Sequence, residues 1–344
     1  MYRAAVIGLG KIGLTFDIPF KGRASSHVMA YQLHPQVELA AGVGRRQEQA
    51  DLLAMIAPET KYYPDGALPS MLRNHELDMI SICTPPTVRY ELLRSVLEQS
   101  SARLIFLEKP VATSIGEAER IVSLLQQYPE RTVVVNLSRR WSEGAMQVRS
   151  AVRNETYGKL KKIHLRYSRG IYNTGSHLFD MVRYMAGSIE QVKVVERVPT
   201  NLDLVEDWTY SFLFTAANGS ISGYAEAFDD RNYNLFEIVL YFDGGVIEMV
   251  QGGDEIRSYM TEPHPLQASM KSLVLEHSER GVLGKSSNME NAINHLVDIL
   301  HSGAEPMCSL EDGIYPLYVA EALNQSYANG GTSEKVREPS PGIA

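Results

Sequence analysis

Residues 3–13, Arg-Ala-Ala-Val-Ile-Gly-Leu-Gly-Lys-Ile-Gly, place a short apolar run directly before three glycines at the spacing G-x-G-x-x-G. The run at residues 4–7 predicts a buried first strand. The glycines then permit a sharp turn, close approach of the backbone to a pyrophosphate, and tight packing of the next helix on the sheet. Phosphates at such a turn meet unpaired N–H groups and the positive end of a helix dipole. The stretch therefore predicts a dinucleotide site that includes Gly8, Gly10, Lys11, Ile12 and Gly13.

Composition restricts the class of protein. The 344 residues are enough for about two domains, and 44% apolar with 22% charged residues is ordinary for a globular chain. A formal charge of -8 argues against a nucleic-acid partner, since such surfaces are normally basic. With no membrane-length apolar run and no signal-peptide pattern, we expect a cytoplasmic protein without a membrane partner. Two cysteines, Cys83 and Cys308, are too few to predict a disulfide framework or a metal site.

The first part of the chain alternates strands with helices. Such alternation predicts a parallel sheet covered by helices on both faces. An irregular segment at residues 15–26 is expected to be a loop inserted beside the glycine turn. The expected strands are residues 4–7, 37–43, 61–63, 79–83, 104–107 and 132–137, with helices at 27–33, 47–57, 68–74, 87–99 and 115–127.

Beyond about residue 158, longer strands and hairpin turns predict a different architecture. Asn218-Gly219 and Asp243-Gly244-Gly245 are typical hairpin turns. The fold class expected is a Rossmann α/β domain followed by an α+β domain with a large, open, mainly antiparallel sheet. We expect domains at 1–128 (dinucleotide binding) and 129–330 (substrate binding and oligomerisation), and a tail at 331–344. The expected strands are residues 160–169, 191–197, 208–216, 220–228, 235–242, 246–251 and 255–260, with helices at 142–153, 176–185, 289–301 and 310–328.

Two further motifs strengthen this prediction. Glu108-Lys109-Pro110 follows the fifth expected strand, and Gly175-Ser176-His177-Leu178-Phe179-Asp180 opens an expected helix. With the glycine turn, they resemble the E-K-P and G-x-H-x-x-D motifs of the glucose-fructose oxidoreductase, inositol dehydrogenase and MocA (Gfo/Idh/MocA) family. The resemblance covers nearly the whole chain and implies an NAD(P)-dependent oxidoreductase.

Lys109 and His177 are the candidate catalytic residues. Lys109 stands at the carboxyl end of a strand, where α/β sheets place functional groups, and the resemblance implies that its ammonium binds a substrate hydroxyl. An imidazole such as that of His177 suits the acceptance of a proton from an alcohol. The alternatives are a solvated surface lysine and a histidine that serves only packing or capping.

One position departs from the family pattern. The family usually has an aspartate four residues before the histidine, whereas this chain has Asn173. An amide can bind a sugar hydroxyl but carries no charge to stabilise an imidazolium. We predict that Asn173 and Tyr172 contact substrate together with Lys109 and His177, and we keep open a member of the family that binds cofactor without turnover.

The end of the second expected strand bears on the choice of cofactor. An acidic residue there usually holds the ribose of NAD, whereas arginine accommodates the 2′-phosphate of NADP. This chain has Arg45 and Arg46 after Gly44, so NADP is favoured over NAD. If one arginine stacks on adenine and the other is merely solvated, either cofactor remains possible.

Two other segments resemble parts of the family's cofactor site. Thr84-Pro85-Pro86 resembles a turn on the nicotinamide side, although Arg89 stands where many relatives have histidine. Asn136, Arg139, Arg140 and Trp141 resemble a segment at the mouth of the pocket. Thr84, Pro85, Glu108, Lys109, Arg140 and Trp141 are accordingly predicted to bind cofactor, with Arg139 expected to be a solvated neighbour.

The leading hypothesis is a dehydrogenase that transfers hydride between NADP or NAD and a secondary hydroxyl of a sugar, cyclitol or nucleotide sugar. The alternatives are a non-catalytic NADP-binding regulatory protein of the same fold and a glycosidase that uses tightly held NAD. An open sheet face in the second half predicts a homodimer or homotetramer.

Overall fold

The computed structural model describes residues 1–200 and 207–339, which form two compact units. The first unit comprises Met1–Trp141, Ser286–Ile314 and Pro339, and the second comprises Ser142–Lys285 and Tyr315–Glu338. These units are defined by contacts. The functional domain bounds at 1–128 and 129–330 remain a proposal, and residues 340–344 of the expected tail lie outside the described residues.

The first unit contains a six-stranded parallel sheet in the order β3-β2-β1-β4-β5-β6, which confirms the predicted Rossmann fold. The apolar residues of the central strands are covered on both faces, and every residue of β4 and β5 is buried. Such two-sided burial is typical of a parallel sheet. The strands are β1 (Tyr2–Ile7), β2 (Val37–Gly44), β3 (Lys61–Pro64), β4 (Met79–Ile82), β5 (Leu104–Glu108) and β6 (Thr132–Asn136).

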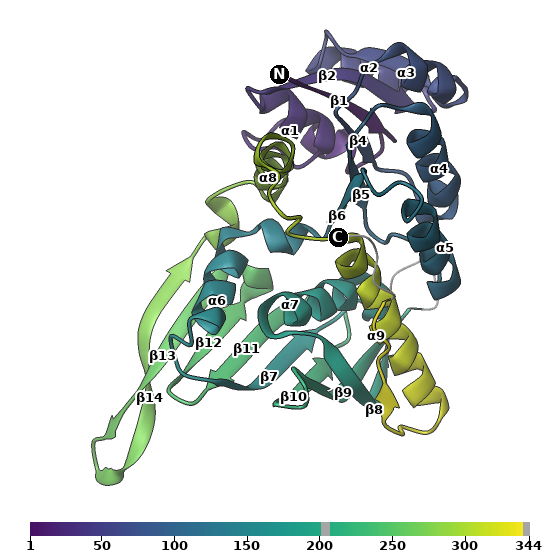
Figure 1. Ribbon diagram of the computed structural model, residues 1–344. Coiled ribbons are helices and arrows are strands. Elements are labelled where there is room, and N and C mark those ends of the chain that lie inside the picture. Colours follow the sequence, from purple (N-terminus) through teal and green to yellow (C-terminus); the bar gives the residue numbers. More distant parts are fainter. Residues whose placement is uncertain (201–206, 340–344) are drawn as a thin grey trace. The chain divides into compact units, whose positions relative to one another are not determined.

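Helices cover both faces of this sheet (Figure 1). Helices α3, α4 and α5 pack side by side, and α1 packs with α8. Local signals set their beginnings: Ser114 accepts a hydrogen bond from the N–H of Glu117 at the start of α5, as a capping serine does. The helices of this unit are α1 (His27–Leu33), α2 (Gln47–Ile56), α3 (Leu68–Asn74), α4 (Arg89–Gln99), α5 (Ile115–Leu125) and α8 (Asn288–Ser302).

The second unit is built on a nine-stranded sheet in the order β14-β13-β12-β11-β7-β10-β9-β8-β15. All neighbours pair antiparallel except β7 and β10, which are parallel, so the predicted mainly antiparallel sheet is confirmed. The strands are β7 (Leu160–Tyr167), β8 (Ile189–Pro199), β9 (Trp208–Ala216), β10 (Ile221–Ala227), β11 (Phe236–Phe242), β12 (Gly245–Val250), β13 (Glu255–His264), β14 (Gln267–Arg280) and β15 (Glu334–Lys335).

Helices α6 (Glu143–Arg153) and α7 (Ser176–Ala186) lie over one face of the nine-stranded sheet (Figure 1). Helix α9 (Leu310–Ala328) completes the chain's helices as far as the described residues go. Among those residues, no helix is long and apolar enough to cross a bilayer.

The long edge strand β14 is a difference from the sequence-based expectation. It forms a hairpin with β13, and that hairpin continues past residue 260, where we expected the strand that begins at residue 255 to end. Most of its described side chains are exposed whichever way they point. The apolar/polar alternation that identifies a half-buried strand is therefore absent.

Candidate functional site

The glycine turn has the geometry that a dinucleotide requires. Gly8 has φ +103°, and a Cβ there would lie 2.9 Å from the carbonyl carbon of Cys83. A Cβ on Gly13 would lie 2.0 Å from the carbonyl oxygen of Gly8, so strand and helix approach too closely for any other residue. At Gly10, by contrast, no atom lies within 4 Å of the Cβ position. The open side of Gly10 is where a phosphate can approach the backbone.

The inserted loop does not interrupt the helical path that starts at the turn. The N–H of Leu14 donates to Gly10 O at 2.9 Å, and after the insertion the N–H groups of His27 and Val28 donate to Ile12 O and Gly13 O, both at 3.0 Å. Helix α1 thus resumes where the glycine turn stopped.

The buried carboxylate of Asp17 closes the base of the loop. It accepts hydrogen bonds from the N–H groups of Ser25 and Ser26, and from the hydroxyl of Ser26 at 2.6 Å. Ser26 in turn caps α1 by accepting from the N–H of Met29. The two ends of the inserted loop are therefore held together by side-chain hydrogen bonds.

A cavity of about 670 Å³ opens at the carboxyl edge of the parallel sheet. This is the edge at which ligands bind in open α/β sheets. Of the residues predicted to bind cofactor, it brings together Gly8, Gly10, Arg45, Arg46, Thr84 and Pro85. Lys11, Ile12, Gly13, Glu108, Lys109, Arg140 and Trp141 are not among its lining residues.

Gln49, at the start of α2, holds two sides of this cavity together. Its Oε1 accepts from the N–H groups of Arg45 and Arg46 at 2.8 and 3.1 Å, and its Nε2 donates to Leu9 O at 2.7 Å. The buried amide fixes the turn after β2 against the glycine turn. Sequence reasoning missed it, because nothing in the local pattern shows that one amide bridges positions 40 residues apart.

The guanidinium groups of Arg45 and Arg46 stand exposed at the cavity. Their nearest acidic groups are loosely placed: Arg45 Nε lies 3.9 Å from Asp65, and Arg46 Nη1 lies 3.9 Å from Glu48. Exposed pairs at this distance contribute little energy, so the guanidinium groups can turn towards an anion. At the far side of the cavity the buried Thr84 Oγ1 has no hydrogen-bond partner among the described residues. The residues present fit a dinucleotide.

Lys109 follows directly after β5 and is half-buried. Burial lowers the pKa of its ammonium from the ordinary lysine value, Glu108 opposes that shift, and Arg139 adds to it. Arg139 is itself half-buried, and burial lowers its pKa to about 10. A lysine whose charge is disfavoured in this way can change protonation state more easily than a surface lysine.

The side chain of Glu108 takes part in a buried polar chain. Its Oε1 accepts from Asn136 Nδ2 at 2.6 Å and lies 2.9 Å from His27 Nε2. The other ring nitrogen of His27 lies 2.9 Å from the hydroxyl of Ser81, which also contacts the hydroxyl of Tyr31 at 2.7 Å. These contacts fix the carboxylate inside the first unit.

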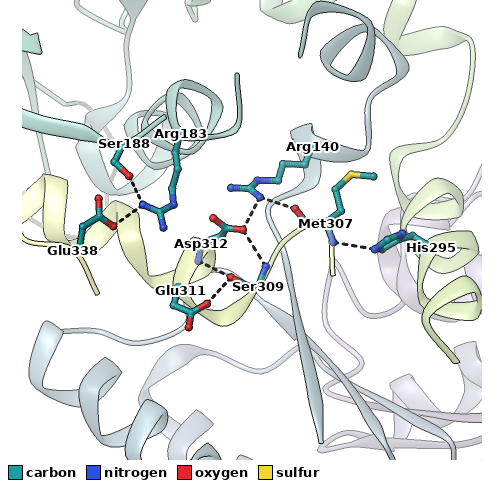
Figure 2. Close-up of polar contacts among 9 residues, drawn as sticks. All are labelled: Arg140, Arg183, Ser188, His295, Met307, Ser309, Glu311, Asp312 and Glu338. Atoms are coloured by element: carbon teal, nitrogen blue, oxygen red, sulfur yellow. Dashed lines mark hydrogen bonds and ion pairs between the residues drawn. The ribbon is translucent and has the colours of Figure 1, made fainter. Parts of the chain in front are cut away.

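Arg140 and Trp141 both hold the chain after β6 in place. Figure 2 shows Arg140 Nη1 donating to the carbonyl oxygen of Met307 at 2.6 Å and to Asp312 at 2.7 Å. The buried indole of Trp141 donates to Asn136 Oδ1 at 3.0 Å and packs against His295. Both side chains are thus engaged with the protein itself.

Arg89 occupies a position that sequence reasoning left open. It is the first residue of α4, and only 1% of it is exposed. Its guanidinium donates to three carbonyl oxygens, those of Thr84, Glu108 and Pro110. It therefore links the turn after β4 to the turn that carries Lys109.

The second unit carries His177, Asn173 and Tyr172. His177 is half-buried in the first turn of α7, and a π-helical segment, Gly170–Gly175, precedes it. Within that segment the carbonyl of Asn173 accepts from Ser176 Oγ at 2.7 Å, and the hydroxyl of Tyr172 accepts from Asn324 Nδ2 at 3.0 Å. Three of the four residues predicted to contact substrate thus lie close together in the sequence of the second unit, whereas Lys109 belongs to the first unit.

Asp207 anchors this segment, and sequence reasoning missed it. Its carboxylate accepts from the backbone N–H groups of Ile171, Tyr172 and Asn173. It lies so close to Gly170 that a Cβ there would meet Asp207 Oδ2 at 2.0 Å. Burial raises the pKa of Asp207 to about 6, although the three N–H groups act in the opposite direction.

The described residues contain no cluster of His, Cys, Asp or Glu suited to a metal ion. The fold and the cavity together define a dinucleotide-binding protein with an associated mixed-sheet unit. Comparison with known proteins agrees: residues 2–137 match the GFO_IDH_MocA family model, described as an oxidoreductase family with an NAD-binding Rossmann fold. Residues 2–137 are thus similar to the NAD-binding domain of the Gfo/Idh/MocA oxidoreductases, and the inositol 2-dehydrogenases among the relatives agree with this likeness.

Individual relatives are distant. An uncharacterized oxidoreductase, YrbE, of Bacillus subtilis is 24% identical over 281 residues, which cover 76% of this chain and 79% of that protein. Inositol 2-dehydrogenase of Salmonella typhimurium is 20% identical over 194 residues, 53% of this chain and 54% of that protein. The solved structure of the transcriptional regulator Gal80p from Kluyveromyces lactis matches with a TM-score of 0.76 and 15% identity, and covers 96% of this chain and 94% of Gal80p. The same architecture is thus found in proteins named as enzymes and as a regulator.

Proposed function

We propose that this protein is an NAD(P)-dependent dehydrogenase acting on a secondary hydroxyl of a sugar, cyclitol or nucleotide sugar. The observation that carries the proposal is the cavity at the glycine turn, at the same sheet edge as the end of β5, where Lys109 stands. The likeness to inositol 2-dehydrogenase supports a polyhydroxylated substrate.

The chain's residues divide the work of holding the cofactor. Gly8, Gly10, Lys11, Ile12 and Gly13 hold the pyrophosphate at the turn, and Thr84 and Pro85 border the nicotinamide side. Arg45 and Arg46 receive the 2′-phosphate, since no acidic residue stands at the end of β2 to bind a ribose hydroxyl. The protein therefore prefers NADP to NAD.

Lys109 and His177 act on the same hydroxyl. The Lys109 amine group binds the hydroxyl oxygen and favours the developing negative charge, and His177 accepts the proton. Asn173 and Tyr172 orient the sugar by hydrogen bonds. When bound, the nicotinamide would accept the hydride from the substrate carbon that carries this hydroxyl.

A substrate panel tests the proposal. Purified protein is mixed with NADP+ or NAD+ and with myo-inositol, free sugars or nucleotide sugars, and nicotinamide absorbance is followed. We expect reduction of NADP+ with at least one compound, and its loss in Lys109→Ala and His177→Ala. Full turnover in both variants would refute the roles assigned to these residues.

A non-catalytic regulator is the second candidate. It is favoured by the replacement of the usual aspartate by Asn173 and by the likeness to Gal80p. Such a protein binds NADPH, turns over nothing in the panel and needs neither Lys109 nor His177 for its action. A glycosidase that uses held NAD is distinguished by release of free sugar without net cofactor change.

The open face of the nine-stranded sheet supports a homodimer or homotetramer. Leu213 and Tyr241 are exposed between buried neighbours, and the strand register places both on the same face. Figure 1 shows α6 and α7 over one face of this sheet, and no described helix of the second unit over the other. Light scattering that finds only monomer at micromolar concentration would contradict this assembly.

A further inference from the structure

The buried guanidinium of Arg89 is unusual in what it binds. Its partners are backbone carbonyl oxygens: Nη1 donates to Glu108 O at 2.5 Å and to Pro110 O, and Nη2 donates to Thr84 O. Burying a charged group is costly unless hydrogen bonds compensate. That cost is visible here, because burial lowers the pKa of Arg89 to about 10.

The bonded carbonyls stand immediately before and after one residue, Lys109. The third carbonyl, that of Thr84, belongs to the neighbouring strand end that borders the cavity. A planar guanidinium with several fixed N–H donors can satisfy three acceptors at once, whereas a lysine ammonium is a point charge on a flexible stem. The bonds therefore fix the backbone of Lys109 relative to the cavity wall.

The side chain before Lys109 is fixed independently. The Glu108 side chain is hydrogen-bonded to Asn136 and His27. These bonds oppose any rotation of Glu108 that would accompany a shift of the turn. Functional groups need supporting contacts of this kind to be held within about 0.5 Å of their working position.

We propose that Arg89 is a positioning residue, which sets the place and the environment of the Lys109 amine by holding the carbonyls on both sides of it. Only the expected effect of Arg89 substitutions on turnover rests on the proposed catalytic role of Lys109. The effect on the Lys109 amine itself is independent of that role.

The test compares Arg89→Lys and Arg89→His with the unaltered protein. Arg94→Lys is the matched control, because Arg94 lies on the same helix but pairs with Glu91 on the surface. The first readout is the pH profile of reductive methylation of Lys109, followed by peptide mass mapping. The second is the Kd for NADPH, from nicotinamide fluorescence. The third is kcat on any compound that the panel identifies.

We expect the methylation midpoint of Lys109 to lie below the ordinary lysine value in the unaltered protein and in Arg94→Lys. In Arg89→Lys the midpoint rises, because the turn relaxes towards solvent. NADPH affinity stays within about 2-fold while kcat falls about 10- to 100-fold, the loss typical of a misplaced catalytic group.

Three results would overturn the inference. One is an unchanged methylation profile in both Arg89 variants. Another is a loss of NADPH affinity in parallel with kcat, which would make Arg89 part of the cofactor site. The third is failure of both variants to fold, which would make its role purely structural. If Lys109→Met keeps full turnover, the proposed function fails, and the methylation profile still decides the role of Arg89.

Discussion

His27 Nε2 lies 2.9 Å from Glu108 Oε1, and both residues are buried in the first unit. The contact separates the roles of two residues in the Glu108-Lys109-Pro110 motif. Glu108 faces inward to the polar chain of His27, Ser81 and Asn136, and the residue after it is left for chemistry. A conspicuous acidic residue of the motif thus serves the architecture of the strand end.

His27→Leu is expected to destabilise the protein, because it removes one of the partners of a buried carboxylate. Loss of a partner for a buried charged group costs about 1–3 kcal/mol or more. His27→Gln keeps a donor near Glu108 and should lose less. Urea unfolding measures the difference, and the exposed His301 provides the control His301→Gln. Equal stability of the Leu and Gln variants would show that the contact contributes nothing.

Substitutions of two glycines in the turn should have different effects, one on NADPH binding and the other on stability. Gly10→Val has space in the folded protein, so we expect near-native stability together with loss of NADPH binding, since the side chain fills the phosphate approach. Gly13→Ala places a Cβ 2.0 Å from Gly8 O and should destabilise the fold itself. Thermal unfolding and NADPH fluorescence separate the two effects. Tight NADPH binding by a folded Gly10→Val would contradict the assigned place of the pyrophosphate.

The parallel sheet could be predicted from the sequence, because the signals for it are local: an apolar run, a glycine turn and strands that alternate with helices. It did not reach β14, whose residues are exposed on both faces and show no alternation. It also missed the partners of Gln49, Arg89 and Asp207. These side chains bind backbone groups 3 to 40 residues away, and the distant contacts depend on how the strand ends meet. The parallel pairing of β7 with β10 is equally a property of the assembled sheet.

Arg45 and Arg46 should determine cofactor preference. Arg45→Ser with Arg46→Ser removes both guanidinium groups near the cavity, and a charge-assisted contact to phosphate contributes about 1.5–3 kcal/mol. We expect NADPH affinity to fall at least about 10-fold while NADH affinity changes little. Isothermal titration with both nucleotides provides the measurement, with exposed Arg120→Ser as the control. A parallel loss of both nucleotides would mean that the arginines bind adenine rather than the 2′-phosphate.

Asp207 should make stability depend on pH in a definite direction. Burial raises its pKa from 3.8 to about 6, so the folded protein binds this proton more tightly than the unfolded chain does. The stabilisation from this group is therefore fully present below about pH 3.8 and is lost as the pH rises through about 6.

Asp207→Asn keeps an acceptor for the N–H groups of Tyr172 and its neighbours but does not titrate. The stability of this variant, relative to the unaltered protein, should rise between pH 4.5 and pH 7.5, as urea unfolding at each pH would show. A constant difference across that window would show that Asp207 titrates at its ordinary value.

The most direct test of the account is a comparison of Lys109→Met with the unaltered protein, by NADPH titration and turnover on the same preparation. We predict that NADPH binds both proteins with Kd values within about 3-fold. Reduction of NADP+ by the active compound of the panel should fall at least about 100-fold in the variant, as for removal of a group that stabilises developing charge. Undiminished turnover in the variant, or failure of the unaltered protein to bind any nicotinamide dinucleotide, would contradict it.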